Sequence, residues 1–355
     1  MQITSVKIIP VELDLRLPYR TAYYADSGVE RVTVVFIRIE TRQGEVAWGC
    51  AAFDPALTGE TIESVTRACH ACADRARDLN PLNLEHALSE LAQLTRDTPS
   101  VQCAFDIAFH DLLGLEARQP LHRILGGYRD RIQTSITINV GSVRETVRMA
   151  QARARQGFRI LKLKGGLSSE EDVQRVRAVN DALPNLTLRL DAEQGYTVQE
   201  AIEVTRALEG QLEMLEQPTP ANNLDALAEV TGHSAIPILA DESVMGPPSA
   251  LEVASRRAAD GLSVKLVTCG GLRCARQIDA ITRAAHLFTM VGCINEPALL
   301  IAAGLSFALS SPSVKYGDLD GHFDLVGDPT VPGFIFADGW LIATEVPGLG
   351  CTIAL

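Results

Sequence analysis

Three acidic residues follow short apolar runs at even intervals along the chain. Asp191 ends LTLRLD, Glu216 ends EMLE and Asp241 ends IPILAD, 25 residues apart in each case. Three carboxylates that converge in a low-dielectric environment repel one another unless a cation lies between them. All-oxygen ligation suits a hard ion, so the pattern predicts one Mg²⁺ per chain. Each acid taken alone could equally cap a helix or pair with a surface base.

Lysines flank this acidic series. Lys162 and Lys164 alternate in the apolar run RILKLK, and Lys265 lies inside SVKL. A lysine inside an apolar strand has no water to face, and burial beside a second ammonium lowers its pKa towards that of a base. Lys164 and Lys265 could therefore remove and return a proton on opposite faces of a carbon beside a carboxylate. A metal on that carboxylate would stabilise the enediolate, and the product is the inverted centre.

These residues need a scaffold that brings strand ends together. Short apolar runs that could be buried strands start near residues 133, 159, 186, 213, 236, 261, 287 and 314, and all but the last precede an amphipathic helical stretch. Eight such units predict a barrel, in which active-site residues lie at the C-terminal ends of the strands. The lysines on strands two and six then flank the acids on strands three to five. No Gly-rich dinucleotide fingerprint supports a doubly wound sheet.

The regions on either side of these units have a different pattern. The first forty-odd residues alternate as strands do, and residues from about 60 to 125 have helical spacing. The sequence therefore predicts an α/β protein with an α+β capping domain over 1–128 and a (β/α)8-type barrel over 129–320. A C-terminal segment, 321–355, is expected to pack back on the capping domain.

The composition excludes several classes of partner. The net charge is −12 and no basic stripe is present, which argues against binding to nucleic acid or to an anionic membrane. The longest apolar run, residues 298–309, is too short to span a bilayer and is expected to be a buried helix. The N-terminal stretch lacks the pattern of a signal peptide. Eight scattered cysteines, two of them in CHAC, are interpreted as small apolar residues of a cytoplasmic protein. The oligomeric state stays open, a homo-oligomer included.

The chain resembles the enolase superfamily, specifically its muconate lactonizing enzyme subgroup, over essentially its whole length. The strings that carry the resemblance are LTGET, LGGYRD, LKLKGG, LRLDAEQGY, LEQP, ADES and SVKLVTCGGL. The resemblance implies a modified (β/α)8 TIM barrel with an α+β capping domain. It also implies Mg²⁺ on Asp191, Glu216 and Asp241, acid/base roles for Lys164 and Lys265, and an enediolate-stabilising role for Lys162.

Within that subgroup the sequence is most similar to the dipeptide epimerases, through Glu296 in CINEP and the pair Asp318 and Asp320. In that family the D-x-D pair after the eighth strand holds the α-ammonium of a dipeptide, and an anionic pair belongs opposite a cation. The resemblance thus implies Mg²⁺-dependent 1,1-proton transfer at the α-carbon of the C-terminal residue. A polar turn before Gly321 would also explain the pair.

Three positions depart from the family pattern. Cys50 stands where WGE is common, Glu193 replaces the usual Asn after the metal-binding Asp, and Asn295 replaces an apolar residue. None of these departures removes a predicted metal ligand or lysine.

The side-chain preference is expected to lie in two loops, residues 18–30 and 53–59. L-Ala-D/L-Glu epimerases carry an arginine in the first loop, whereas this chain has Tyr23, Tyr24 and Asp26 there. An acidic substrate side chain is therefore not expected. Tyr24 and Phe53 would suit an apolar or aromatic dipeptide, whereas Asp26, with Glu30 and Asp54, would suit a cationic one. The sequence favours the apolar alternative slightly.

Other functions could use the same residues. N-acylamino acid racemase, o-succinylbenzoate synthase and muconate-type cycloisomerase are alternatives, although their substrates bring no ammonium for Asp318 and Asp320 to hold. A non-catalytic, metal-stabilised barrel is the alternative from another class. A Schiff-base aldolase would also use a barrel lysine but would not need the three carboxylates.

Overall fold

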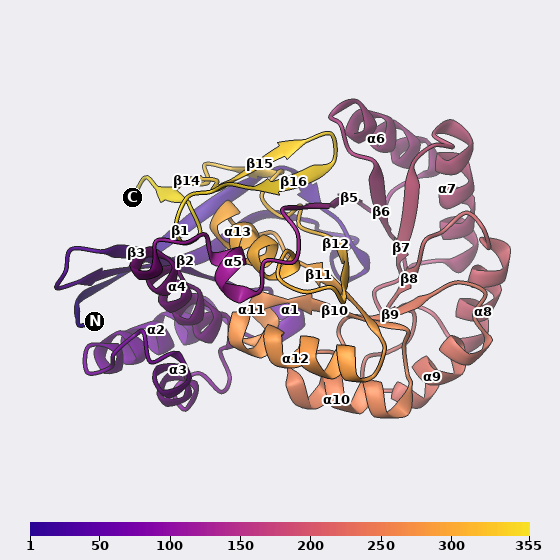
Figure 1. Ribbon diagram of the computed structural model, residues 1–355. Helices are drawn as coiled ribbons and strands as arrows, with labels where there is room; N and C mark the ends of the chain where they lie inside the picture. The colour runs from indigo at the N-terminus through magenta and orange to yellow at the C-terminus, as the bar shows by residue number, and fades with distance from the viewer.

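A computed structural model describes residues 1–355, and in it a capping domain lies beside a barrel (Figure 1). The capping domain is built on an antiparallel sheet of order β13-β1-β2-β3. Its strands are β1 (Ile3–Tyr19), β2 (Val29–Thr41), β3 (Val46–Ala52) and β13 (Leu325–Val326). Its helices are η1 (Ala22–Tyr24), α1 (Pro55–Thr58), α2 (Ile62–Ala76), α3 (Leu84–Ala92), α4 (Pro99–Ala117) and α5 (Leu121–Leu125).

The two faces of this sheet have different partners. Alternate residues of β2 point to opposite faces, as in any strand. Val35 and Ile37 join the core formed with α2, α3 and α4, in which Phe105 packs edge to face on Phe109. Val34 and Phe36, on the other face, join the core that continues into the barrel. The apolar alternation of β2 therefore fixes the capping domain onto the barrel as well as onto its own helices.

Eight parallel strands form the nearly closed barrel, and their order in the sheet is their order in the chain. They are β5 (Ser135–Ile138), β6 (Ile160–Lys164), β7 (Thr187–Asp191), β8 (Leu215–Glu216), β9 (Ile238–Ala240), β10 (Gly261–Lys265), β11 (Phe288–Gly292) and β12 (Val314–Gly317). Each begins within two residues of its predicted position. A single bridge between Thr134 and Gly317 joins the first and last strands.

Helices connect consecutive strands around the outside of the barrel (Figure 1). They are α6 (Val143–Arg155), α7 (Ser169–Ala182), α8 (Val198–Ala207), α9 (Leu224–His233), α10 (Pro247–Arg256), α11 (Leu266–Cys269), α12 (Leu272–Ala284) and α13 (Ala298–Ala308). No helix follows β12, so the barrel is modified at its eighth unit, and the predicted fold class is confirmed. Every residue of α13 is buried, as expected for the longest apolar run.

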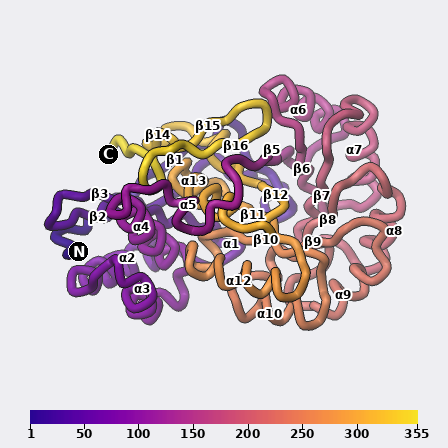
Figure 2. Tube along the Cα trace, in the orientation of Figure 1, coloured from indigo at the N-terminus to yellow at the C-terminus, as the bar shows by residue number.

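The C-terminal segment returns to the side of the molecule where the chain begins (Figure 2). Its strands are β13, β14 (Thr330–Val331), β15 (Phe334–Ala337), β16 (Trp340–Ala343) and β17 (Thr352–Ile353). β13 pairs with β1 of the capping domain, and β16 pairs with β4 (Arg131–Gln133), which precedes the barrel. The domain boundaries at 128 and 320 stay a prediction.

No helix of the structure combines the length and the apolar character that a bilayer crossing requires. All eight cysteines are free. Cys69 and Cys72 lie buried on α2, and burial raises the pKa of both thiols to about 12. Because thiolates are the reactive and metal-binding form of cysteine, the CHAC string is not suited to redox or zinc chemistry.

Candidate active site

The parallel register brings the predicted residues to one end of the barrel. Lys164 at the end of β6 lies beside Asp191 on β7, which lies beside Glu216 on β8. Asp241 directly follows β9, and Lys265 ends β10. Lys162, Lys164 and Lys265 line one cavity together with Asp318 and Asp320, which follow β12.

The three carboxylates form a buried group suited to a cation. One oxygen each of Asp191, Glu216 and Asp241 lies within 4.8 Å of the others. Glu216 is 2% exposed, and its Oε1 has no hydrogen-bond partner. Burial raises the pKa of Glu216 to about 8, and Asp191 and Asp241 add to the shift although Lys162 opposes it. An unpartnered buried oxygen in an all-carboxylate group fits the donor set of Mg²⁺.

The lysines contact these carboxylates directly. Lys162 Nζ lies 3.0 Å from Asp191, 2.8 Å from Glu216 and 2.8 Å from Asp318. Lys164 Nζ lies 2.9 Å from Asp191 and 2.7 Å from Glu193 Oε1. Lys265 pairs with Asp241 on the far side of the acidic group.

The pKa values of these lysines differ from the sequence-based expectation. Burial lowers the pKa of Lys162 and Lys164, but Asp191 and the other neighbouring carboxylates outweigh it and hold both well above the usual value. The pKa of Lys265 is raised in the same way by Asp241 and Glu242. The sequence pattern predicts that these lysines are buried and lie near a second ammonium, and both features lower a lysine pKa. It does not predict how close the carboxylates lie, and in the protein without a bound cation these carboxylates raise the pKa.

The two aspartates of the D-x-D pair have different surroundings. Asp318 accepts a hydrogen bond from Ser135 Oγ at 2.5 Å and pairs with Lys162, whose charge keeps the Asp318 pKa below its usual value despite burial. Asp320 accepts from the backbone N–H of Thr137 at 2.7 Å and makes no ion pair. Burial and the charge of Asp318 raise the pKa of Asp320 to about 6. Asp320 is therefore the member of the pair that lacks a cationic partner.

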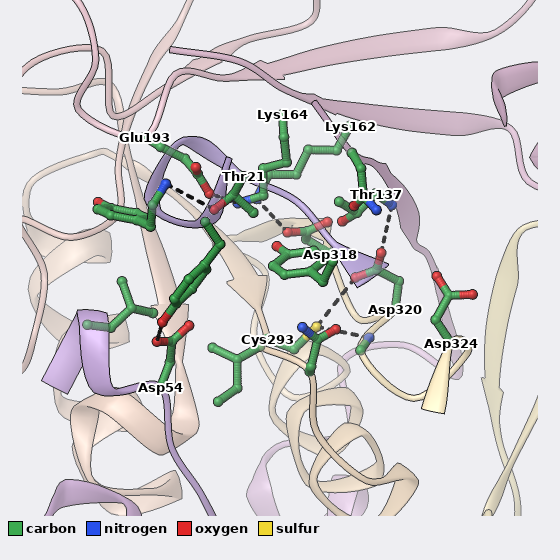
Figure 3. Close-up of a pocket in the computed structure, with 18 of the residues that line it drawn as sticks. Thr21, Asp54, Thr137, Lys162, Lys164, Glu193, Cys293, Asp318, Asp320 and Asp324 are labelled. Carbon is green, nitrogen blue, oxygen red and sulfur yellow. Dashed lines mark hydrogen bonds and ion pairs between the residues drawn. The ribbon is translucent and has the colours of Figure 1, made fainter. Parts of the chain in front are cut away.

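Capping-domain loops close this cavity, and they contribute some of the predicted residues but not others (Figure 3). Tyr24 of the capping domain lines it, and its hydroxyl donates to Asp54. Asn295 also lines it, but from the barrel loop that follows β11. Phe53 instead lines a neighbouring cavity, which shares Tyr24 and Asp54 with the first. Asp26 is exposed and lines neither. The structure therefore does not bring Asp26 or Phe53 to the lysines.

Glu296 is also absent from the wall of the cavity. It is 4% exposed, and burial raises its pKa to about 8. Its backbone region packs against the chain after β12, since a Cβ at Gly321 would meet the Glu296 nitrogen at 3.1 Å. Glu296 is thus buried close enough to Lys265 and Asp320 for their charges to affect its pKa, but it does not line the cavity.

Besides Asp324, which pairs with Arg153, two further acidic residues line the cavity and were not predicted to act there. Glu242 accepts a hydrogen bond from the Tyr23 hydroxyl at 3.1 Å, and its Oε2 has no partner. Glu193, noted in the sequence only as a departure, contacts Lys164. Both acids follow a predicted metal-binding aspartate closely, in DAE and ADE, and that position in the sequence is the signal that could have identified them.

Comparison with known proteins places the chain in a family. Residues 3–126 match the family model described as mandelate racemase / muconate lactonizing enzyme, N-terminal domain, and residues 145–354 match enolase C-terminal domain-like. An L-Lys-D/L-Arg epimerase of Methylococcus capsulatus is 36% identical, with 99% of each chain covered. An L-Ala-D/L-Glu epimerase of Clostridium acetobutylicum is 32% identical, with 99% of this chain and 98% of the relative covered.

A solved structure extends the likeness to three dimensions. The dipeptide epimerase from Enterococcus faecalis, complexed with Mg and the dipeptide L-Leu-L-Tyr, superposes with a TM-score of 0.95 at 30% identity, covering 99% of this chain and 100% of that one. These relatives are epimerases, which are isomerases acting on amino acid derivatives, so the prediction of an isomerase is confirmed. The chain belongs to the mandelate racemase/muconate lactonizing enzyme family of the enolase superfamily.

Proposed function

We propose that this chain is a Mg²⁺-dependent dipeptide epimerase that inverts the α-carbon of the C-terminal residue of its substrate. The observation that carries the proposal is a single cavity lined by lysines from β6 and β10, which stand on either side of β7, β8 and β9, the strands that lead to the buried carboxylate triad. A 1,1-proton transfer needs a base on one face of the carbon and an acid on the other. Relatives that are named dipeptide epimerases, one of them solved with Mg and a dipeptide, support the same reaction.

Asp191, Glu216 and Asp241 would hold the metal. When bound, Mg²⁺ polarises the substrate carboxylate, acidifies the adjacent carbon and offsets the charge of the three acids. The unpartnered oxygen of Glu216 supports this assignment, because a buried carboxylate oxygen without a donor is costly in the absence of a cation.

Lys164 and Lys265 exchange the α-proton. The lysine that accepts the proton must be a neutral amine. The carboxylates that raise the lysine pKa in the protein alone would lose most of that influence with a cation bound among them. The other lysine donates a proton to the opposite face as an ammonium. Lys162 lies between Asp191, Glu216 and Asp318 and supplies a fixed positive charge near the substrate carboxylate. Because Lys164 and Lys265 stand on strands separated by β7, β8 and β9, each serves one configuration of the substrate.

Asp320 binds the free ammonium of the dipeptide. Its carboxylate is buried at the wall of the cavity without a cationic partner, whereas Asp318 already pairs with Lys162. An N-acylated substrate would bring no positive charge to that position. This contrast favours a dipeptide over the substrates of an N-acylamino acid racemase, an o-succinylbenzoate synthase or a cycloisomerase.

The preferred substrate carries a cationic side chain, which reverses the slight apolar preference drawn from the loop sequence. Asp54 and Glu242 line the loop end of the cavity, and the side chains that contact them there are the hydroxyls of Tyr24 and Tyr23. Neither acid makes an ion pair, and Glu242 Oε2 has no partner at all. A lysine or arginine side chain of the dipeptide would supply the positive charge that these acids lack. The name of the 36% identical relative, an L-Lys-D/L-Arg epimerase, agrees with this preference.

Incubation of dipeptide libraries with the enzyme and Mg²⁺ in D₂O tests the proposal, with α-deuterium followed by mass spectrometry. Deuterium should enter only the C-terminal residue, fastest in dipeptides with lysine or arginine. Exchange in N-acylated amino acids but not in free dipeptides would favour the racemase instead. A complete lack of exchange in every substrate class would leave a non-catalytic metal-binding barrel as the better explanation.

A further inference from the structure

Glu193 occupies an unusual position beside the lysine on β6. It is 5% exposed, and its backbone has φ of 43°, in the left-handed region that residues other than glycine rarely adopt. This conformation directs the side chain towards two different parts of the molecule. Oε1 lies 2.7 Å from Lys164 Nζ, and Oε2 accepts a hydrogen bond from the backbone N–H of Ala22 at 2.5 Å.

Ala22 belongs to the loop that joins β1 to β2 and covers the cavity. Ala22 is the first residue of η1, which follows Thr21, and the side chains of Thr21, Tyr23 and Tyr24 all line the cavity. Figure 3 places Glu193 and Lys164 near Thr21, on the side of the cavity away from Asp320. The carboxylate of Glu193 therefore joins the covering loop to Lys164 through two direct contacts.

The side of the cavity at Lys265 lacks an equivalent connection. Lys265 pairs with Asp241, and Asp241 makes no hydrogen bond or ion pair with the loop. The loop does reach Glu242 through the Tyr23 hydroxyl, but Glu242 makes no hydrogen bond or ion pair with Lys265. The two proposed acid/base lysines thus differ in how they are connected to the loop.

We propose that Glu193 is a positioning residue that couples closure of the β1–β2 loop to the placement of Lys164. This inference rests on the proposed epimerase function. The other partner of Lys164, Asp191, belongs to the triad assigned to the metal, so Glu193 is the partner whose charge is not committed to the ion. When the N–H of Ala22 docks on Oε2, Oε1 is held against Lys164, and an open loop releases both contacts.

The length and charge of the side chain both matter for this role. Glutamine keeps the length but removes the charge that strengthens the bond to Lys164. Asparagine, the residue that the family resemblance leads one to expect here, is one methylene shorter and neutral. Neither replacement should reproduce the double contact. Glu193→Gln tests the effect of the charge, and the comparison of Glu193→Asn with Glu193→Gln tests the effect of side-chain length.

The test compares exchange on the two faces of the substrate in the Mg²⁺-loaded enzyme. Initial rates of α-deuterium incorporation are measured in D₂O for both configurations of the C-terminal residue of one dipeptide. Lys164→Ala and Lys265→Ala first assign each configuration to its lysine. Glu193→Gln should slow exchange at the Lys164 configuration about tenfold to hundredfold, as expected when a charged hydrogen bond to a reacting group is lost. Exchange at the Lys265 configuration should stay within about twofold, which serves as the control for folding and metal binding.

Ala22→Pro tests the loop contact without touching either lysine. Proline lacks the N–H, and the first position of a helical turn tolerates it. Thr21, the residue before it, already has the extended backbone that proline requires, with φ of −133° and ψ of −178°. The variant should raise KM and shift the ratio of the two exchange rates in the same direction as Glu193→Gln. In a Glu193→Gln background it should shift that ratio no further.

Two results would overturn the coupling. One is a Glu193→Gln enzyme in which both configurations slow equally, which would indicate a general structural role. The other is an Ala22→Pro enzyme with a higher KM but an unchanged ratio of exchange rates, which would separate the loop from Lys164. A wild-type enzyme that exchanges neither configuration would instead refute the proposed function, so the two failures are distinguishable.

Discussion

The strand ends of the barrel and the capping-domain loops face the same cavity but are held in different ways. Lys162 and Lys164 are 2% and 8% exposed, and their ammonium groups contact buried carboxylates. Tyr23, on the loop, is 36% exposed, and the hydroxyls of Tyr23 and Tyr24 reach acids at the rim of the cavity. A substrate can replace a neutral hydroxyl at a carboxylate more readily than it can separate a buried ion pair. Under the proposed function, the strand ends carry out the proton transfer, and the loops select the substrate by its side chain.

The largest effect is expected from Glu216→Gln, which removes charge from the triad and retains its shape. Deuterium exchange should fall about 10³-fold or more, because a metal ligand that stabilises developing charge is weakened. The rise in Tm on adding Mg²⁺ should shrink or disappear. In metal-free protein the Tm should hold or rise, because the burial cost and repulsion that raise the Glu216 pKa to about 8 are relieved.

The exposed Glu209 provides a matched control, since Glu209→Gln removes the same charge outside the cavity. It should leave both exchange and the Mg²⁺-dependent Tm unchanged. An undiminished Mg²⁺ effect on Tm in Glu216→Gln would contradict the metal assignment. The strand ends would then have to be explained as a network of ion pairs alone.

Replacement of the lysines should divide the strand ends into two functional halves. Lys164→Ala should slow exchange for one configuration of the C-terminal residue by about 10²- to 10⁴-fold, the range for loss of a general acid or base. Lys265→Ala should do the same for the other configuration. Mass spectrometry of each purified diastereomer in D₂O measures this directly, with the exposed Lys315→Ala as control. Equal losses for both configurations in each variant would refute the assignment of one lysine to each face.

Asp320→Asn should have an intermediate effect, because it removes a charged contact to the substrate rather than a reacting group. We expect kcat/KM for a free dipeptide to fall about tenfold to hundredfold. In the native enzyme, the Asp320 pKa of about 6 implies that kcat/KM falls as the pH drops below 6, since protonation removes the charge that holds the ammonium. The variant should lose that dependence.

Asp338→Asn is the control for this change, because Asp338 is an exposed carboxylate that pairs with Arg159 and does not line the cavity. It should alter neither kcat/KM nor its pH profile. An Asp320→Asn enzyme that keeps the native pH profile and affinity would show that the ammonium binds elsewhere.

The contrast between the two regions also explains what the sequence could predict. Strand positions follow from hydrophobic periodicity, and parallel register then brings strand ends to one level, so Asp191 and Glu216 could be placed beside each other before any coordinates. Charged residues in apolar runs are conspicuous, and this feature led to the prediction that Lys265 is an active-site residue. Periodicity does not state which neighbours a buried charge will have. Arg189, two residues before Asp191, is 2% exposed and donates to the Gly317 carbonyl inside the barrel, a contact that no pattern in LTLRLD indicates.

Loop residues lack such a rule. Asp26 and Asp54 are both acidic residues in loops of the capping domain, and no pattern in the sequence ranks one above the other. The structure exposes Asp26, whereas Asp54 caps α1, accepts from Tyr24 and lines the cavity. The direction of a loop side chain depends on tertiary contacts across many residues, here between positions 24 and 54. Local propensity carries no information about such contacts.

The smallest effect, and the one that best sharpens the comparison, is expected from these two loop aspartates. Asp54→Asn should reduce the preference for a cationic over an apolar dipeptide about tenfold, because one half-buried charge at the rim is lost while the hydrogen bond to Tyr24 can persist. Asp26→Asn removes the same charge from an exposed position and should change the preference by less than about twofold, because solvent screens it. Competition between a lysine-containing and a leucine-containing dipeptide in one reaction measures the ratio of kcat/KM values for each variant. If both variants changed that ratio equally, the long-range electrostatic effect of the loop charges, rather than their direct contact with the substrate, would set the preference.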